Sequence, residues 1–144
     1  MDLIGLLQIS ASGLAAQQLR MEVTSANLAN AHATRSDRGG PYLRQEPVFR
    51  STAVPGGRAG FQDRLRHHLQ QVIVQDVRSD ASGPRRVYDP GHPDADGEGF
   101  VLMPNVDVMR EMVDLIQASR TYESNVNALG VTRAMLLKAL EIGK

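Results

Sequence analysis

Apolar residues recur at alternating steps of three and four along the last quarter of the chain. One line of positions runs through the whole stretch from 105 to 142: Met112, Leu115, Ser119, Tyr122, Val126, Leu129, Arg133, Leu136 and Leu140. A second, shorter row, Met109, Val113 and Ile116, widens the stripe at its start. This spacing predicts a single helix about 57 Å long, at about 1.5 Å per residue, with a heptad seam on one face.

The ends of this predicted helix carry residues that start and stop helices. Pro104 cannot sit inside a helix, and Asn105 or Asp107 can cap the first turn. Gly143 supplies a stop after Ile142. A helix of this length is too long for one small domain to enclose, so we expect it to need partner helices.

The N-terminal stretch, 3–30, shows a second seam of the same kind. Its positions are Ile4, Leu7, Ala11, Leu14, Gln18, Met21, Ser25 and Leu28. Small residues surround this seam, and Arg20 and Glu22 are the only charged residues between Leu3 and Ala31. A helix with so few charges is normally buried nearly all round. We therefore expect other chains, as well as the C-terminal helix, to cover it.

The middle of the chain has short apolar runs separated by Gly, Pro and Asp. It predicts extended segments at 42–49, 70–77, 86–88 and 100–103, with Pro47 confining the first to a sheet edge. Residues 50–60, 79–84 and 89–99 are expected to be loops, and 61–69 is ambiguous. The predicted fold class is α+β: two long terminal helices paired as an antiparallel coiled coil, with a small β-rich insert between them. We place the helical core at 1–34 and 105–144 and the insert at 35–104.

Composition excludes some classes of function. Lys plus Arg and Asp plus Glu number 16 each, so the formal net charge is zero and nothing favours binding to nucleic acid. The chain has no Cys, which excludes disulfides, thiolate metal sites and a Cys nucleophile. No apolar run reaches 18 residues, so no transmembrane helix is expected, and the N-terminus lacks the basic start of a secretory signal.

Candidate metal sites are incomplete. Asp94, Asp96, Glu98 and Gly99 match the first positions of a calcium loop, but Asn105 stands where that loop needs a bidentate carboxylate. The Asp and Gly residues are better interpreted as turn formers.

A zinc site is equally poorly supported. His67 and His68 are adjacent and cannot share one face of a helix or strand, and Asp63 is the nearest possible further ligand. No nucleophile elbow, phosphate loop or dinucleotide fingerprint occurs. We therefore expect no catalytic residues, no metal site and no cofactor.

Several segments resemble a known family. SASGLAAQQLRMEVTSANLANAHAT (10–34) resembles the N-terminal signature of bacterial flagellar axial proteins, whose core is an ANxAN element, here at 26–30. GGPYLRQEPVF (39–49) and VYDPGHPDADGEGFVLMPNVDV (87–108) are similar to basal-body rod proteins within that family. The segment 112–144, which ends in ALEIGK, resembles their C-terminal helix.

The resemblance implies a structural subunit of the proximal rod of the flagellar basal body, without enzymatic activity. It implies export through the flagellum's own secretion apparatus without a cleavable signal peptide. It also implies assembly in the periplasm into a tubular drive shaft that transmits torque and surrounds the export channel. The implied partners are copies of the chain, other rod proteins, the rod–ring adaptor, the inner-membrane ring protein and the export apparatus. No nucleic acid or small-molecule substrate is implied.

The predicted assembly interface consists of apolar and Asn positions on the two helices, because Asn on a seam can fix register. The positions are Leu7, Leu14, Met21, Asn27, Leu28, Asn30, Met112, Leu115, Tyr122, Asn125, Val126, Asn127, Leu129, Leu136 and Leu140. Two other classes stay open. One is a stand-alone coiled-coil adaptor that dimerises through the 105–142 seam, and the other is an enzyme with a metal at His92, Asp94 and Asp96.

Overall fold

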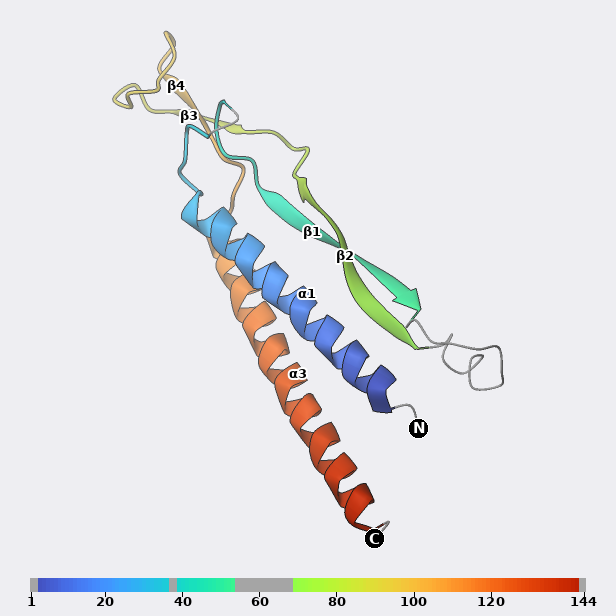
Figure 1. Ribbon diagram of the computed structural model, residues 1–144. Coiled ribbons are helices and arrows are strands. Elements are labelled where there is room, and N and C mark those ends of the chain that lie inside the picture. The colour runs from blue at the N-terminus through green and yellow to red at the C-terminus, as the bar shows by residue number, and fades with distance from the viewer. Residues whose placement is uncertain (1–2, 37–38, 54–68, 143–144) are drawn as a thin grey trace.

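Two long helices with a small β insert between them in sequence make up the fold (Figure 1). The computed structural model describes residues 3–36, 39–53 and 69–142. Helix α1 spans Leu3–Ala29 and helix α3 spans Val108–Ile142, and they lie side by side in opposite directions. The four strands within these described ranges are β1 (Gln45–Ala53), β2 (Gln70–Ser79), β3 (Arg85–Tyr88) and β4 (Phe100–Met103). They form two separate antiparallel pairs, β1 with β2 and β3 with β4, so the predicted α+β class is confirmed.

Helix α1 is the middle layer of an elongated molecule. Helix α3 lies along one side of it and the β1–β2 hairpin along a second side, while β3 and β4 sit at the end where α1 finishes and α3 begins (Figure 1). The hairpin is tied to α1 where the backbone N–H of Val72 donates to Oγ of Ser12 at 3.2 Å. A two-stranded hairpin is marginally stable by itself, so this one depends on α1 for support.

Asp107 starts α3. Its Oδ1 accepts hydrogen bonds from the backbone N–H groups of Met109 at 3.0 Å and Arg110 at 3.3 Å, which is the geometry of an N-cap. Of the two predicted caps, Asp107 is therefore the one used, and the helix begins three residues later than 105. The predicted stop at Gly143 lies outside the described residues.

The strands match the predicted runs with shifted ends. Strand β1 begins at Gln45 rather than 42 and continues to Ala53, into the predicted loop, because it pairs with the whole length of β2. Pro47 lies opposite Val77 and is tolerated, since both strands of a two-stranded sheet are edges. The segment 61–68, which the sequence left ambiguous, is outside the described residues.

Burial is concentrated at one end of the helix pair. Val101, Val106 and Ala31 are almost fully buried there, close to β3 and β4. Ala118 is 0% exposed and is the last buried residue of α3 within the described part of the chain; Leu140, near the other end, is 69% exposed. The pair thus has a buried end and an open end. Neither α1 nor α3, nor any other described helix, is long and apolar enough to cross a membrane.

Glycine substitutions test the tight loop between β3 and β4. Gly99 has a φ of +82°, and a Cβ there would lie 3.0 Å from Cε2 of Tyr88 and 3.2 Å from Cβ of Pro90. We expect Gly99→Ala to lower the free energy of unfolding by about 2 kcal/mol or more, from backbone strain and overpacking together. Urea unfolding curves measure it.

Two matched glycines separate the causes. Gly83 has a φ of +71° with open space around it. Gly83→Ala should therefore lower the free energy of unfolding by only about 1 kcal/mol, from backbone strain alone. Gly97 has open space and no positive φ, so Gly97→Ala should be close to neutral. Equal losses for Gly99→Ala and Gly83→Ala would show that Tyr88 and Pro90 move aside.

Candidate assembly interface

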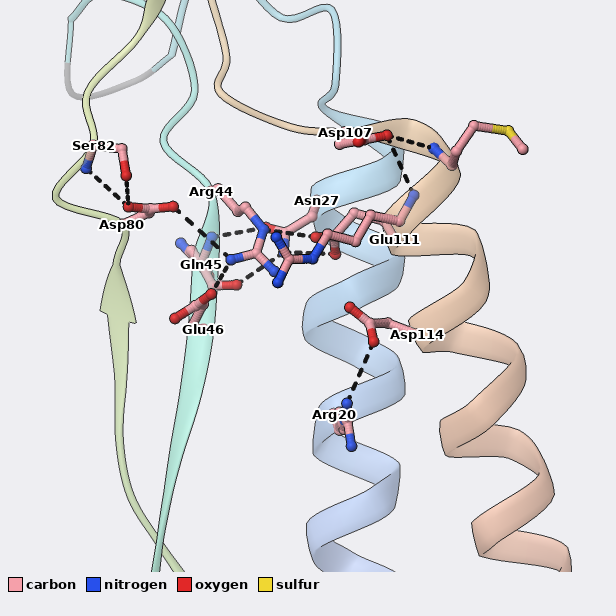
Figure 2. Close-up of polar contacts among 12 residues, drawn as sticks. Arg20, Asn27, Arg44, Gln45, Glu46, Asp80, Ser82, Asp107, Glu111 and Asp114 are labelled. Carbon is pink, nitrogen blue, oxygen red and sulfur yellow. Dashed lines mark hydrogen bonds and ion pairs between the residues drawn. The ribbon is translucent and has the colours of Figure 1, made fainter.

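A polar cluster joins α1, α3 and the start of β1 at the buried end of the helix pair (Figure 2). We call it the clasp; it consists of Asn27, Tyr42, Arg44, Gln45 and Glu111. The Asn27 amide donates to the carbonyl oxygen of Gln45 at 2.8 Å and to Oε2 of Glu111 at 3.1 Å. Its Oδ1 accepts from the N–H of Gln45 at 2.8 Å and from the hydroxyl of Tyr42 at 2.9 Å. Asn27 is 1% exposed, and all four hydrogen-bonding positions of its amide are filled.

Glu111 connects α3 to the clasp as a buried anion. It is 1% exposed, and Nε of Arg44 donates to its Oε1 at 2.6 Å. Burial works to lower the pKa of Arg44, but hydrogen bonds to Glu111 and Glu46 outweigh it and raise that pKa. Burial, and then the negative charge of Glu111, raise the pKa of Tyr42, so its hydroxyl stays protonated as a donor. The buried charge of Glu111 is therefore paired, as a buried charge must be.

Two contacts fix how the helices are aligned along each other. Asn27 of α1 meets Glu111 of α3, and a Cβ built on Gly13 would lie 3.5 Å from Nδ2 of Asn125. Gly13 is fourteen residues before Asn27, and Asn125 is fourteen residues after Glu111, so both contacts belong to one antiparallel register. An ion pair between Arg20 and Asp114, 3.5 Å apart, also crosses between the helices (Figure 2).

This register defines the line on each helix that faces the other. None of the residues on either line is exposed. The inner line of α1 is Ile9, Gly13, Ala16, Arg20, Val23 and Asn27, and that of α3 is Glu111, Leu115, Ala118, Tyr122, Asn125 and Leu129. Small residues of α1, such as Gly13 and Ala16, thus face larger residues of α3.

The predicted seam of α1 does not face α3. Each position of this seam lies two residues before a position of the inner line or of its continuation, as Leu7 lies before Ile9. Two residues turn a helix by about 200°, at about 100° per residue, so the seam and the inner line lie on different sides of α1. Leu7, Ala11, Leu14, Gln18, Met21, Ser25 and Leu28 form the outer face of α1, and each of them is exposed or half-buried. The predicted seam of α3 is divided: Leu115, Tyr122 and Leu129 lie on the inner line, while Met112 and Val126 are exposed.

Helix α3 also has an outer face, on the side away from α1. Its residues are all exposed: Met109, Val113, Ile116, Arg120, Asn127, Val131, Met135 and Lys138. Met109 is 71% exposed and Val113 61% exposed, so the row that was expected to widen the seam points to the opposite side. An open hollow of about 500 Å³ lies here, lined by Val113, Ile116, Gln117, Arg120, Thr121 and Ser124. Exposed apolar surface of this extent is typical of a contact site for another protein.

The predicted interface residues thus fall into separate groups. Leu7, Leu14, Met21 and Leu28 lie on the outer face of α1, and Met112, Val126, Asn127 and Leu140 are exposed on α3. Leu115, Tyr122, Asn125 and Leu129 lie on the inner line of α3, and Leu136 continues that line one heptad further. Asn27 is wholly engaged within the chain, and Asn30 donates from its amide to the carbonyl oxygen of Ala26.

Sequence reasoning missed Tyr42, Arg44 and Glu111. Glu111 stands beside Met112 on the predicted seam and resembles an ordinary solvent-facing acid. Only a seam drawn one position earlier, through Ala118 and Asn125, would have placed it between the helices.

The carboxylates of the candidate metal constellation bind different partners. Asp94 accepts from the hydroxyl of Thr34 at 2.7 Å and pairs with Arg35, whereas Asp96 accepts from two backbone N–H groups of its own turn. The Nδ1 atom of His92 accepts from the N–H of Asp94 at 3.1 Å. No group of three or more His, Asp and Glu side chains that could hold a metal occurs in 3–36, 39–53 or 69–142. Asp63, His67 and His68 lie outside these ranges.

A long helix pair with apolar outer faces has the form of a subunit that packs beside other subunits. Comparison with known families agrees with this class. A family model described as flagella basal body rod protein matches residues 7–35. A second, described as the C-terminal part of the flagellar basal body rod FlgEFG proteins, matches residues 98–142.

Individual relatives identify the branch of this family. The flagellar basal-body rod protein FlgC of Escherichia coli O6:H1 is 40% identical, with 100% of both chains aligned. FlgC of Bacillus subtilis strain 168 is 41% identical with 96% of each chain aligned, and FlgC of Aquifex aeolicus is 37% identical over 100% of this chain and 99% of its own. The chain belongs to the FlgC family of flagellar basal-body rod proteins, which confirms the resemblance found in its sequence. None of these names supports a stand-alone coiled-coil adaptor.

The clasp yields a stability prediction. Asn27→Asp keeps the shape of the side chain but removes the amide donor to Gln45 and places a second carboxylate against Glu111. We expect a loss of about 3 kcal/mol or more in the free energy of unfolding, because a buried charge is left uncompensated. The same substitution at exposed Asn127 should change stability by less than about 0.5 kcal/mol. Coincident urea unfolding curves for the two variants would contradict the described hydrogen bonds.

The contact between Thr34 and Asp94 yields a pH prediction. The hydrogen bond from Thr34, and then the ion pair with Arg35, hold the pKa of Asp94 below its ordinary value despite the opposing effect of burial. A lowered folded-state pKa stabilises the fold above the unfolded value of about 3.9, and this stabilisation is lost as the pH falls through the lowered value. Thr34→Val should therefore destabilise the protein at pH 6 and make little difference near pH 2.

Urea unfolding at the two pH values measures this difference. Thr132→Val is the matched control, because the hydroxyl of Thr132 bonds a helix carbonyl oxygen and no carboxylate. A Thr34→Val effect that is the same at both pH values would show that Asp94 does not depend on Thr34.

Proposed function

We propose that this chain is a structural subunit of the proximal rod of the flagellar basal body. The observation that carries the proposal is the pair of apolar outer faces on α1 and α3 in a chain of the FlgC family. Surfaces such as Val113 and Ile116, more than half exposed, are costly to leave in water and are covered when subunits pack. The subunits packed around each copy are further copies of the chain and other rod proteins.

Within this proposal the helix pair acts as an antiparallel coiled coil. The inner lines alternate in steps of three and four, as a heptad seam does, and Gly13 and Ala16 allow close approach. Residues 1–34 and 105–144 then form the helical core, and 35–104 forms an insert that faces outward from it.

The assembly contacts are proposed on those residues of the predicted set that lie on the outer face of α1 or are exposed on α3. On α1 they are Leu7, Leu14, Met21 and Leu28, and on α3 they are Met112, Val126, Asn127 and Leu140. Because the two outer faces differ in sequence, one face of a copy meets a different face of the next, and such heterologous contacts propagate instead of closing. A tube that carries torque and surrounds an export channel is the product expected of this packing.

The proposed location follows from the resemblance to axial proteins. The chain passes through the flagellar export apparatus without a cleavable signal peptide and assembles in the periplasm. The rod–ring adaptor and the inner-membrane ring protein are its further proposed neighbours.

Charged substitutions on the outer faces test the proposal. Leu14→Glu on α1 and Val113→Glu on α3 should leave urea unfolding within about 1 kcal/mol of the unsubstituted chain, because neither residue is buried. In cells whose only copy of the gene carries either variant, motility and rod formation should be lost, because a charge would be buried between subunits.

Leu102→Glu is the matched control, since Leu102 is exposed on β4 and away from both faces. It should leave cells motile. Motile cells carrying Leu14→Glu or Val113→Glu, with rods of normal length in isolated basal bodies, would refute the proposed faces.

A further inference from the structure

We infer that the clasp positions the β1–β2 hairpin relative to the helix pair, and that assembly depends on this position more than folding does. The inference rests on the proposed function, because it concerns how an assembled subunit presents its insert. Asn27, Arg44 and Glu111 are the positioning residues.

Apolar packing does not fix the direction of the hairpin. No residue of β1 or β2 is buried, and Phe49, Val72, Val74 and Val77 are each more than a third exposed. Contacts between half-exposed apolar side chains are non-directional and tolerate sliding. Something other than a core must therefore hold the hairpin in place along α1.

The directional contacts of the hairpin are polar. At its base, the Asn27 amide bonds both the N–H and the carbonyl oxygen of Gln45, each at 2.8 Å, as a neighbouring strand would. Further along, the N–H of Val72 donates to Oγ of Ser12 at 3.2 Å. Hydrogen bonds weaken steeply when they are misaligned, so two such ties set an angle as well as a distance.

The clasp also relates the hairpin to α3, which the hairpin does not lie against (Figure 1). Arg44 immediately precedes β1, and its Nε donates to Oε1 of Glu111 at 2.6 Å (Figure 2). Glu111 in turn accepts from Asn27 at 3.1 Å. One cluster, in which Asn27 and Glu111 are buried, thus links α1, α3 and β1, so a tilt of the hairpin distorts its hydrogen bonds.

Burying this charge pair is a costly way to gain stability. Replacing a whole buried ion pair with apolar residues of similar size is often neutral or stabilising, whereas removing one partner is strongly destabilising. The main contribution of the cluster is therefore to hold α1, α3 and β1 in one relative arrangement. In an assembly that covers the outer faces of both helices, this geometry decides which neighbour the hairpin reaches.

A triple variant distinguishes the effect of the clasp on the position of the hairpin from its effect on the stability of the fold. Asn27→Leu, Arg44→Met and Glu111→Met together replace the polar cluster with apolar side chains and leave no fully buried charge. Of the other carboxylates that pair with Arg44, Glu46 is exposed and Asp80 is half-buried. We expect urea unfolding close to that of the unsubstituted chain, a broader distribution of hairpin positions, and loss of rod assembly in cells. Since the chain has no Cys, spin labels on Ser51→Cys in β1 and Asn127→Cys in α3 report this distance distribution by electron–electron double resonance.

Arg44→Lys provides a second, conservative variant in case the triple variant does not fold. It keeps the charge but loses the planar fork that reaches Glu111 and Glu46 together, so the distance distribution should broaden measurably. The control is Arg78→Lys, because Arg78 is exposed on β2 and, among the residues that the structure describes, pairs along its own strand with Asp76. Its distribution should match that of the unsubstituted chain.

The outcomes decide the inference separately from the proposed function. A distance distribution that stays narrow in both clasp variants, or motile cells carrying a triple variant with a broadened distribution, would overturn the inference. If Val113→Glu cells were motile but the clasp variants broadened the distribution, the proposed faces would fail while the positioning role of the clasp within the chain would stand.

Discussion

The packing of α1 against α3 covers only one side of each helix, and the rest of the structure depends on that limit. The inner lines are covered by the partner helix and, on α1, a further side is covered by the hairpin. The outer faces keep residues such as Met109 and Val113 in contact with solvent. The helix pair leaves the apolar residues of the outer faces uncovered, so the hydrophobic burial of a single copy is incomplete.

The sequence was most informative where local periodicity determines structure. Both helices and all four strand runs could be predicted, and the cap of α3 could be narrowed to Asn105 or Asp107, because each depends on neighbours within a few residues. The strand ends could not, since β1 extends as far as β2 offers a partner and that pairing is long-range.

The sequence alone did not determine which stripe of α1 faces α3, for a specific physical reason. The stripe through Leu7, Leu14 and Met21 is more apolar than the one through Gly13, Ala16 and Arg20, so hydrophobicity alone selects it. Helix α3 instead packs on the less apolar stripe, where small residues permit close approach and Asn27 supplies a buried bond to Glu111. Periodicity identifies that a helix has two usable faces, but tertiary contacts decide which face is used within the chain.

Helix α3 is longer than α1, with 35 residues against 27. In the register set by Gly13 and Asn125, about seven residues of α3 extend past the first described residue of α1, a projection of about 10 Å. Leu137 and Leu140 lie on this free end and are more than half exposed. A neighbour stacked along the helix axis would lie side by side with this projection. Such an overlapping contact resists bending better than an end-to-end contact between two helices.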